Sequence, residues 1–424
     1  MSLGDLYFLV GGFLKFLFYS GLEWLQSSKY HQYTIMDLHN PETLSVLISK
    51  HVVDVNGHTS SRFDFTVDER DLGAGGTGTE RSSLVATLED GTKLHLFVKF
   101  PARKFAERVF LTMFKVYQNE VTFYDKMDCL PVGVSQLFPK SYCSKLISRN
   151  TGKFIIILED ISFRQGSNGN SCEFYSIKSG DFLKSDCKSV LSELARLHAS
   201  CWGNPPAHVW HHDPVTGNVM GEAPPRCPVI LKEGGKKVQE RYCAVVSFPA
   251  DVITAYNQSV NYYPAIRRFW SRETLTCCHG DSHVGNYCFF SRSSSGSRGV
   301  GMFDLQCMAA EHGMRDVSYH LVTSYAADRL AEDEEELIKH YITELKAHYA
   351  SSHNGGLLDL SYSKAYFLYR CYGVTALHAF FASAGFAEMV IDSAAVVTVQ
   401  RIVTTCHRLN ILGAINDMIE QAKV

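Results

Sequence analysis

The first part of the chain has the alternation of apolar and polar residues that is typical of β-strands. Segments 63–67 and 83–88 come first, and a third begins after the Asp90-Gly91 pair, which is a strong hairpin signal. The apolar residues of the third segment are Leu94, Leu96, Val98 and Phe100. Because neighbouring side chains of a strand point to opposite faces, Lys99 is expected to face away from these apolar residues.

Longer apolar patterns follow, and most of them predict helices. Apolar residues at three-and-four spacing predict one helix over residues 104–127, which carries Glu120. Residues 154–158 are continuously apolar and predict a buried strand, with a lobe boundary after it. Further helices are predicted around residues 190–197, 331–350, 361–384 and 393–421. Residues 203–250 are rich in Pro, Gly, Lys and Glu and are expected to form an irregular insertion.

Two apolar stretches lie near the N-terminus, at residues 6–14 and 16–22, and Lys15 separates them. Neither is long enough to span a bilayer alone. Two interpretations stay open: a helix that docks on the rest of the protein, and a helix that lies in a membrane interface. The second rests on residue types that prefer the headgroup boundary, namely Phe8, Phe13, Phe16, Phe18 and Trp24.

Composition narrows the function classes. The 424 residues are 46% hydrophobic and 20% charged, as in ordinary globular proteins, and this length favours two lobes. The formal net charge is -3, from Lys+Arg 41 and Asp+Glu 44, so no overall basic field favours nucleic acid as a partner. The 13 cysteines are odd in number and contain no C-x-x-C pair, which favours a reducing compartment and a cytoplasmic location.

Polar and ionisable residues concentrate in segment 277–290, which precedes a Ser/Gly/Arg loop and the strand-like residues 300–304. If this loop is symmetric about Ser295, the two flanking segments pair so that Tyr287 opposes Phe303 and Asn286 opposes Asp304. An amide oxygen and a carboxylate side by side suit Mg²⁺. Asp281, five residues before Asn286, is then left to accept a proton.

These residues occur in the order of the parts that kinases use for phosphoryl transfer: a glycine-rich stretch (residues 73–78), Lys99, Glu120, Asp281, Asn286 and Asp304. The motif His279-Gly280-Asp281-x-x-x-x-Asn286, together with Asp304-Leu305-Gln306, resembles the aminoglycoside phosphotransferase and choline kinase-like superfamily. It looks most like the ecdysteroid kinase-like (CHK kinase-like) branch, to which residues 194–202 are also similar. The resemblance covers roughly residues 60–385.

The resemblance implies an α+β, two-lobed protein-kinase-like fold with a small β-rich N-lobe and a larger, mainly helical C-lobe. The expected parts are an N-terminal hydrophobic helix in residues 1–35, a nucleotide-binding lobe in 36–160, and a catalytic and acceptor-binding lobe in 161–424. By the same resemblance, Asp281 is the catalytic base, and Asn286 and Asp304 bind Mg²⁺. The residues expected to bind or orient ATP are Lys99, Glu120, Gly75, Gly76, Gly78, Glu159, Asp160 and Ile161.

Two departures from the family pattern concern the substrate and the nucleotide. His283 stands where the branch often has Trp, and the glycine stretch lacks the spacing found in protein kinases. The expected activity is transfer of the γ-phosphoryl group of ATP to a hydroxyl of a small molecule, with a lipophilic, sterol-like acceptor as one candidate. The enzyme is expected in the cytoplasm, with peripheral membrane contact through residues 1–25 as an added interpretation.

Two other functions compete with this interpretation. His279, Asp281 and His283 alternate and, with His312, could bind zinc in a metallohydrolase. A kinase fold without turnover could serve as a binding protein, although every ionisable role is filled here. His279 has a structural alternative, in which its imidazole bonds backbone carbonyls. Asp316 either braces the 279–286 loop or caps a helix.

Overall fold

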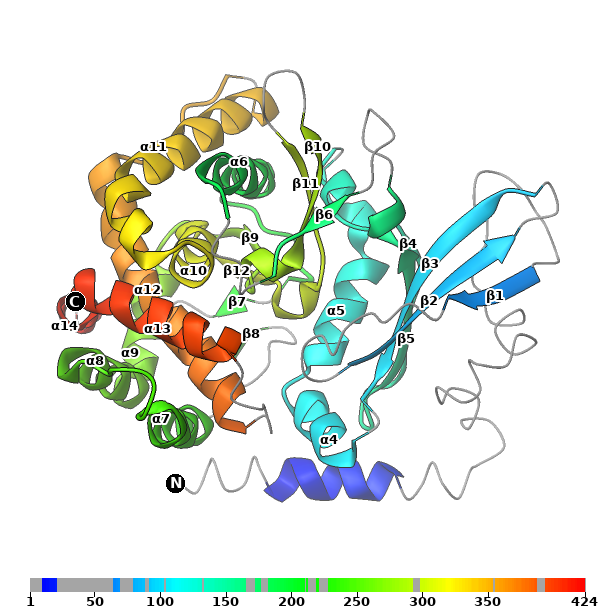
Figure 1. Ribbon diagram of the computed structural model, residues 1–424, viewed down its shortest axis with the longest axis horizontal. Helices are drawn as coiled ribbons and strands as arrows, with labels where there is room; N and C mark the ends of the chain where they lie inside the picture. The colour runs from blue at the N-terminus through cyan, green and yellow to red at the C-terminus, as the bar shows by residue number, and fades with distance from the viewer. Residues whose placement is uncertain are drawn as a thin grey trace. The chain divides into compact units, whose positions relative to one another are not determined.

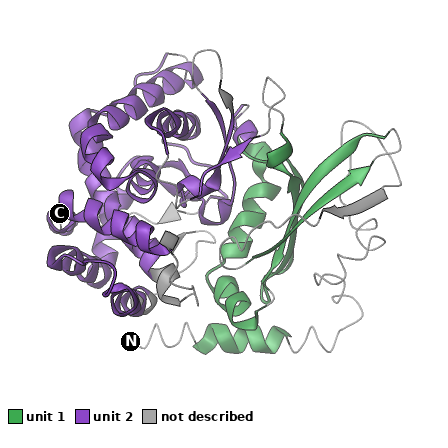
Figure 2. Cartoon of the chain, in the orientation of Figure 1, with its two compact units in different colours: residues 1–130, 138–164 green, residues 131–137, 165–424 purple. Residues whose placement is uncertain are grey.

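The computed structural model describes residues 10–20, 64–68, 79–87, 91–102, 104–131, 133–164, 172–176, 182–209, 211–212, 219–220, 228–292, 298–353, 355–386 and 393–423. The chain divides into two compact units, which Figure 2 colours separately. The first unit contains residues 1–130 and 138–164, and the second contains residues 131–137 and 165–424.

A five-stranded antiparallel sheet organises the first unit, in the order β1-β2-β3-β5-β4 (Figure 1). Its strands are β1 (Asp64–Asp68), β2 (Thr79–Thr87), β3 (Lys93–Pro101), β4 (Ser141–Ser148) and β5 (Lys153–Glu159). The predicted strands and the β2–β3 hairpin are confirmed, and Gly91 takes the positive φ of 82° that its turn requires. Alternate apolar side chains of β2, β3 and β5 form a core: Leu84, Ala86, Leu96, Val98, Phe100, Ile155 and Ile157.

The single helix predicted over residues 104–127 is wrong, because the structure has two. Helix α4 (Phe105–Met113) and helix α5 (Val116–Asp125) are separated by Lys115, which adopts a left-handed backbone with φ 55°. A left-handed residue cannot continue an α-helix, so α5 starts in a new direction. The chain also forms a helix at residues 10–20, which packs on α4. None of the described helices combines the length and hydropathy needed to cross a bilayer.

Helices dominate the second unit. They are α6 (Lys184–Ser200), α7 (Pro228–Tyr242), α8 (Ala250–Asn261), α9 (Tyr263–Ser271), α10 (Met314–Ser324), α11 (Ala327–Ser352), α12 (Tyr362–Phe386), α13 (Ser393–Arg408) and α14 (Ile411–Gln421). Short strands complete it: β6 (Glu173–Phe174), β7 (His211–His212), β8 (Val219–Met220), β9 (Thr276–Cys278), β10 (Tyr287–Arg292), β11 (Arg298–Met302) and β12 (Ala309–Glu311). The 3-10 turns are η1 (Met127–Cys129) and η3 (Ile161–Phe163) in the first unit, and η2 (Ser135–Leu137), η4 (Val284–Asn286) and η5 (Leu305–Cys307) in the second. The expected α+β class, with a small sheet-based part and a larger helical part, is confirmed.

The predicted helix pattern of the second unit needs correction at two places. The 203–250 insertion is not irregular throughout, because it contains α7. A glycine is needed at position 235 of this helix, because a Cβ there would lie 2.2 Å from the Tyr256 ring of α8. The helix predicted over residues 393–421 is interrupted at Asn410. The left-handed backbone of Asn410, with φ 48°, separates α13 from α14, and its side chain accepts the Gly413 amide as the N-cap of α14.

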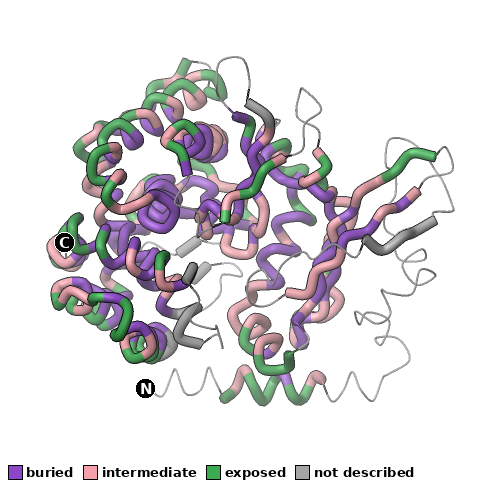
Figure 3. Tube along the Cα trace, viewed as in Figure 1, coloured by how far each residue is buried: buried purple, intermediate pink, exposed green. Residues whose placement is uncertain are grey.

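Helix α10 is the buried centre of the second unit. All of its residues are buried (Figure 3), and it packs against α12 and α13. The helix nevertheless carries several polar side chains. Buried polar groups persist only where they are hydrogen-bonded, so the partners of these side chains indicate what α10 holds in place.

Candidate active site

In the first unit, Lys99 and Glu120 form a buried ion pair. Lys99 lies on β3 and Glu120 on α5, and the Lys99 Nζ is 2.6 Å and 2.8 Å from the two carboxylate oxygens. The exposed fractions of the two residues are 3% and 1%. A buried charge is stable only when it is paired, so Glu120 fixes the position of the ammonium group. The structure thus brings together the lysine and the glutamate that the sequence analysis singled out.

The glycines Gly75, Gly76 and Gly78, predicted to bind the nucleotide, lie outside the described residues. The predicted hinge, Glu159 to Ile161, follows directly from the end of β5. The Glu159 amide donates to the Lys140 carbonyl at 2.8 Å, and the Asp160 amide donates to the His95 carbonyl at 2.9 Å. These two amides are therefore already used within the first unit and are not donors for adenine.

The hinge side chains are also engaged. Asp160 accepts hydrogen bonds from the Ser83 hydroxyl at 2.8 Å and from the Ser162 amide at 3.1 Å. Glu159 pairs with Arg164, whose Nε lies 2.9 Å from a carboxylate oxygen. Burial raises the pKa of Glu159, but the hydrogen bond and charge of Arg164 outweigh it and leave that pKa below its usual value. Both carboxylates thus have structural contacts that order the end of β5.

In the second unit, β10 and β11 form the expected hairpin, but its predicted register is wrong. Arg292 pairs with Arg298, in agreement with a loop centred on Ser295, yet Tyr287 pairs with Met302. A bulge between Phe289 and Arg292 shifts the strands by one residue. Asn286 is therefore level with Phe303, whose amide donates to the Asn286 carbonyl at 3.1 Å, and not with Asp304.

The 279–286 loop, which leads from β9 to β10, places Asn286 beside Asp281. The Asn286 Nδ2 lies 2.8 Å from the Asp281 carbonyl and 3.3 Å from its carboxylate Oδ2. Both partners are oxygen acceptors, so the nitrogen of the amide faces Asp281 and the amide oxygen is directed elsewhere. Asp281 and Asp304 are half-buried, whereas Asn286 is 4% exposed.

Tyr319 binds the other oxygen of Asp281. Its hydroxyl donates to Oδ1 at 2.9 Å from helix α10. Burial, followed by the charge of Asp281, raises the pKa of Tyr319 well above its ordinary value, so the phenol keeps its proton and remains a donor. Asp281 is consequently held from both sides, by Tyr319 on Oδ1 and by Asn286 on Oδ2.

His279 supports the loop through backbone contacts. Its Nε2 lies 3.0 Å from the Phe303 carbonyl, and its Nδ1 accepts the Asp281 amide at 3.3 Å. These partners fix the tautomer, since a carbonyl requires a donor and an amide requires an acceptor. Burial lowers the pKa of His279 and favours the same neutral form. The predicted structural role of His279 is confirmed.

Asp316 of α10 holds the start of the loop. Its carboxylate accepts the His279 amide at 2.6 Å and the Gly280 amide at 2.8 Å. Burial raises the pKa of Asp316, but the hydrogen bond from His198 and the charges of His198, His279 and Arg315 outweigh it and hold the pKa below its usual value. The bracing role is confirmed, and the alternative is wrong, because Asp316 lies inside α10 and Gly313 is at its N-cap.

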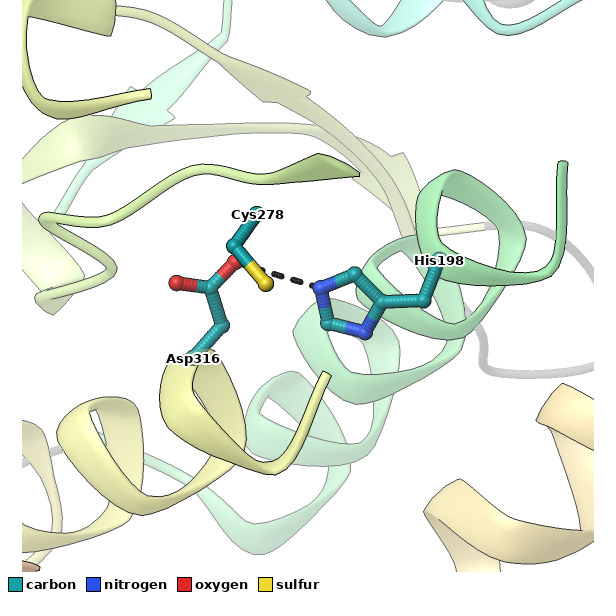
Figure 4. Close-up of side chains that lie close together, drawn as sticks. All are labelled: His198, Cys278 and Asp316. Carbon is teal, nitrogen blue, oxygen red and sulfur yellow. Dashed lines mark hydrogen bonds and ion pairs between the residues drawn. The ribbon is translucent and has the colours of Figure 1, made fainter. Parts of the chain in front are cut away.

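His198 of α6 positions Asp316 in turn. Its Nε2 lies 3.1 Å from Oδ2 of Asp316, and its Nδ1 lies 2.8 Å from the Tyr341 hydroxyl. Figure 4 shows the imidazole directed at the carboxylate, with Cys278 beside them. Among the described residues, these three are the group close enough to hold a metal ion. Both His198 nitrogens and both Asp316 oxygens already have partners, and burial raises the pKa of Cys278, so we assign the cluster to loop support.

Gly280 is required at its position for two reasons. Its φ is 82°, and a Cβ there would lie 1.9 Å from the Cys307 carbonyl oxygen. Any larger residue would push the loop away from the segment that follows Asp304.

Asp304 itself adopts a left-handed conformation, with φ 63° and ψ 62°. This conformation is uncommon for residues other than glycine and asparagine, and it directs the chain from β11 into η5. The carboxylate of Asp304 and the amide oxygen of Asn286 are the hard oxygen donors that Mg²⁺ prefers. The donor set therefore fits the predicted metal.

Comparison with known proteins gives a family match in this part of the chain. Residues 230–353 match the ecdysteroid kinase-like family. The match includes Asp281, Asn286, Asp304 and Asp316, and it confirms the expected resemblance for this segment. No curated protein matches the chain.

The solved structures that are similar to the chain include three kinases. A choline kinase from Cryptosporidium parvum Iowa II is 12% identical, with 90% of this chain and 96% of that chain covered at a TM-score of 0.46. A Plasmodium vivax ethanolamine kinase is 13% identical, with 91% and 93% covered and a TM-score of 0.44. A microcompartment-associated aminopropanol kinase is 10% identical, with 86% and 95% covered and a TM-score of 0.43.

The zinc site proposed as a competing interpretation is not supported by the geometry. Both ring nitrogens of His279 bind backbone groups. His312 is buried and its Nδ1 accepts the Met314 amide at 3.1 Å. His283 Nε2 lies 3.8 Å from Asp281, and its Nδ1 accepts the Gly285 amide. Among the described residues, no group of metal ligands contains these histidines together.

Sequence reasoning missed most of the loop's supports on α10. His320 Nδ1 lies 3.0 Å from the Ser282 carbonyl, and the Ser324 hydroxyl accepts the Val284 amide at 2.8 Å. With Asp316 and Tyr319, these residues have the i, i+3, i+4, i+8 spacing of one helix face. That spacing was the available signal, because it places the four side chains on one side of a helix.

Proposed function

We propose that the protein is a Mg²⁺- and ATP-dependent kinase that phosphorylates a hydroxyl group of a small molecule. One observation carries the proposal: Asp281, held by Tyr319 and Asn286, lies on a loop that α10 supports, within the segment matching the ecdysteroid kinase-like family. The buried Lys99–Glu120 pair of the first unit supplies the second part that phosphoryl transfer requires.

In the proposed reaction, Asp281 binds the acceptor hydroxyl and takes its proton as the oxygen attacks the γ-phosphorus. The bond between the γ-phosphorus and the β,γ-bridging oxygen breaks, and ADP leaves with the electron pair. Base catalysis of this kind contributes about 10² to 10⁴-fold. Tyr319 and Asn286 keep the carboxylate from rotating, so its orientation does not have to be set during the reaction.

Asn286 and Asp304 would hold Mg²⁺, which neutralises phosphate charge when bound. Lys99 would bind the ATP phosphates, with Glu120 keeping the ammonium group directed at them. We also propose that the acceptor is lipophilic, a sterol-like alcohol being one candidate, and that the enzyme works in the cytoplasm.

The first test is thermal stability of the purified protein with Mg·ATP, with ATP plus EDTA, and with Zn²⁺ alone. A ligand that binds the folded state raises the melting temperature by mass action, so no acceptor is needed. We expect Mg·ATP to raise it, EDTA to abolish the rise, and Asp304→Ala to remove it. No shift with nucleotide and a clear shift with Zn²⁺ would contradict the proposal.

Turnover separates a kinase from a binding protein that keeps the fold. Asp281→Asn should retain the Mg·ATP shift and lose about 10² to 10⁴-fold in transfer of the γ-phosphoryl group to acceptor alcohols or water. A wild-type protein that binds Mg·ATP and transfers nothing to any alcohol or to water would favour the non-catalytic interpretation.

A further inference from the structure

The helix of residues 10–20 docks on α4 through one side only. Phe16 is 1% exposed and packs edge-to-face on Phe105, with ring centroids 5.4 Å apart. Gly12 lies over Met113, where an added Cβ would come within 2.7 Å of the Met113 side chain. The docked side of the helix is therefore centred on Gly12 and Phe16, as expected for one of the two interpretations of the N-terminus.

The other side of this helix exposes large apolar side chains. We define the N-terminal apolar face as Val10 (47% exposed), Phe13 (42%), Leu14 (57%), Leu17 (41%) and Phe18 (63%). At about 100° per residue, these five positions fill an arc of roughly 140° that contains no polar residue. Lys15 is exposed and lies beside this arc, between it and the docked side.

A soluble helix that only docks would normally present polar residues to water on this side. The apolar surface also continues onto α4, where Phe105 is 44% exposed and touches Phe16. Apolar patches of this size are often functional, so we considered which phase or molecule could cover this one.

The size of the apolar face and the charges around it distinguish a protein partner from a membrane surface. The five side chains expose on the order of 450 Å², well below the roughly 800 Å² that each partner buries in a stable protein interface. Of the described charged residues nearby, Lys15 is exposed beside the N-terminal apolar face, and Lys104 is paired with Glu107, with 3.4 Å between the charged atoms. Aromatic and aliphatic residues with flanking lysines are typical of helices that lie in a membrane interface.

We propose that the N-terminal apolar face inserts into the interface of an anionic membrane and holds the protein at the lipid surface. Phe13, Leu14, Leu17 and Phe18 enter the acyl boundary, and Lys15 binds lipid phosphate or carboxylate groups. This inference does not depend on the proposed kinase activity.

The test is binding of the full chain to vesicles, measured by co-sedimentation. The probes are phosphatidylcholine vesicles with and without about one-third phosphatidylserine. We expect binding to the anionic vesicles and at least a hundredfold loss of partitioning in Leu14→Gln/Phe18→Gln, because each buried large apolar side chain contributes about tenfold or more. Glutamine is used because it adds no charge that anionic lipid would repel.

Leu357→Gln is the matched control. Leu357 is 97% exposed in the second unit, so its variant removes an exposed leucine without touching the N-terminal apolar face. It should bind as wild type does. Lys15→Gln should weaken binding to anionic vesicles about fivefold and reduce its salt dependence. Unchanged melting temperatures would show that all variants are folded.

Two results would overturn the inference. One is wild-type protein that stays in the supernatant with anionic vesicles at low salt. The other is a wild-type dimer in solution that Leu14→Gln/Phe18→Gln converts to a monomer, because the face would then be an interface between copies of the chain.

Discussion

The Lys99–Glu120 pair makes the most specific stability prediction. Glu120→Gln removes the carboxylate that lies 2.6 Å and 2.8 Å from the Lys99 ammonium, and leaves a cation that is 3% exposed without its partner charge. Removing one member of a buried pair costs about 3 to 5 kcal/mol, because the remaining charge stays desolvated. For a folding unit of roughly 150 residues, this lowers the melting temperature by about 6 to 20 °C.

A double variant separates stability from nucleotide binding. Lys99→Met/Glu120→Leu replaces both charges with apolar groups of similar size, which is often neutral for stability. We expect it to unfold in urea within about 1 kcal/mol of wild type and to lose the thermal shift with Mg·ATP. The single variant should lose both stability and the shift.

The outcomes of the two variants test different parts of the reasoning. A Glu120→Gln variant as stable as wild type would show that the pair is not desolvated. A double variant that is stable and still binds Mg·ATP with unchanged affinity would show that Lys99 does not bind phosphate. Glu240→Gln, which changes a weak surface pair with 3.9 Å between charges, should leave both measurements unchanged.

Three further predictions concern the second unit. Asp316→Ala leaves the buried His279 and Gly280 amides without acceptors and should cost roughly 2 to 6 kcal/mol in urea unfolding, whereas Asp359→Ala on the surface should cost nothing measurable. Tyr319→Phe removes the hydrogen bond to Asp281 and should lower ATP turnover about tenfold while the Mg·ATP thermal shift persists; equal losses of both would mean a general structural defect. Burial lowers the pKa of His312 from 6.5 to about 3, so between these values the unfolded chain holds a proton on His312 that the folded chain lacks, and the contribution of His312 to stability should fall by about 1.4 kcal/mol for each unit by which the pH decreases from 6.5 to 3. His312→Asn, which keeps an acceptor for the Met314 amide, should reduce this slope in unfolding measured at several pH values; an unchanged slope would refute the assignment.

Local periodicity predicted the strands of the first unit and the facing of Lys99. These predictions hold because alternation along a strand depends only on which face the core covers, and the core of β2, β3 and β5 covers one face. The partner of Lys99 was predicted from the resemblance to kinases. Two predicted helices are interrupted in the structure for one shared reason. Lys115 and Asn410 have left-handed backbone conformations, which end an α-helix. Apolar spacing continues through such residues and does not show the change of direction.

The supports of the 279–286 loop were harder to predict, because they come from distant parts of the sequence. Asp281 and Asn286 belong to one motif, but their partner Tyr319 lies on α10, and His198, which positions Asp316, lies on α6. Each of these residues alone is typical of a helix with one polar position. Only the packing of α6 and α10 against the loop shows that these polar side chains all position the 279–286 loop.

The position of Asp304 in the β10–β11 hairpin was also not predictable from the local sequence. Symmetry about Ser295 is correct at the loop, where Arg292 pairs with Arg298, and fails beyond the bulge. Asp304 therefore does not face Asn286 across the ladder, and its left-handed backbone, with φ 63°, turns the chain after β11 instead. A left-handed residue other than glycine costs on the order of 1 kcal/mol and persists where the surrounding structure or the chemistry requires it. The family match, which includes Asp304, and this conformation both favour chemistry as the reason that an aspartate occupies the position. Backbone preference alone would favour a glycine at position 304. An aspartate there therefore says little about the local structure that a sequence pattern could predict, and it indicates a functional requirement for the carboxylate.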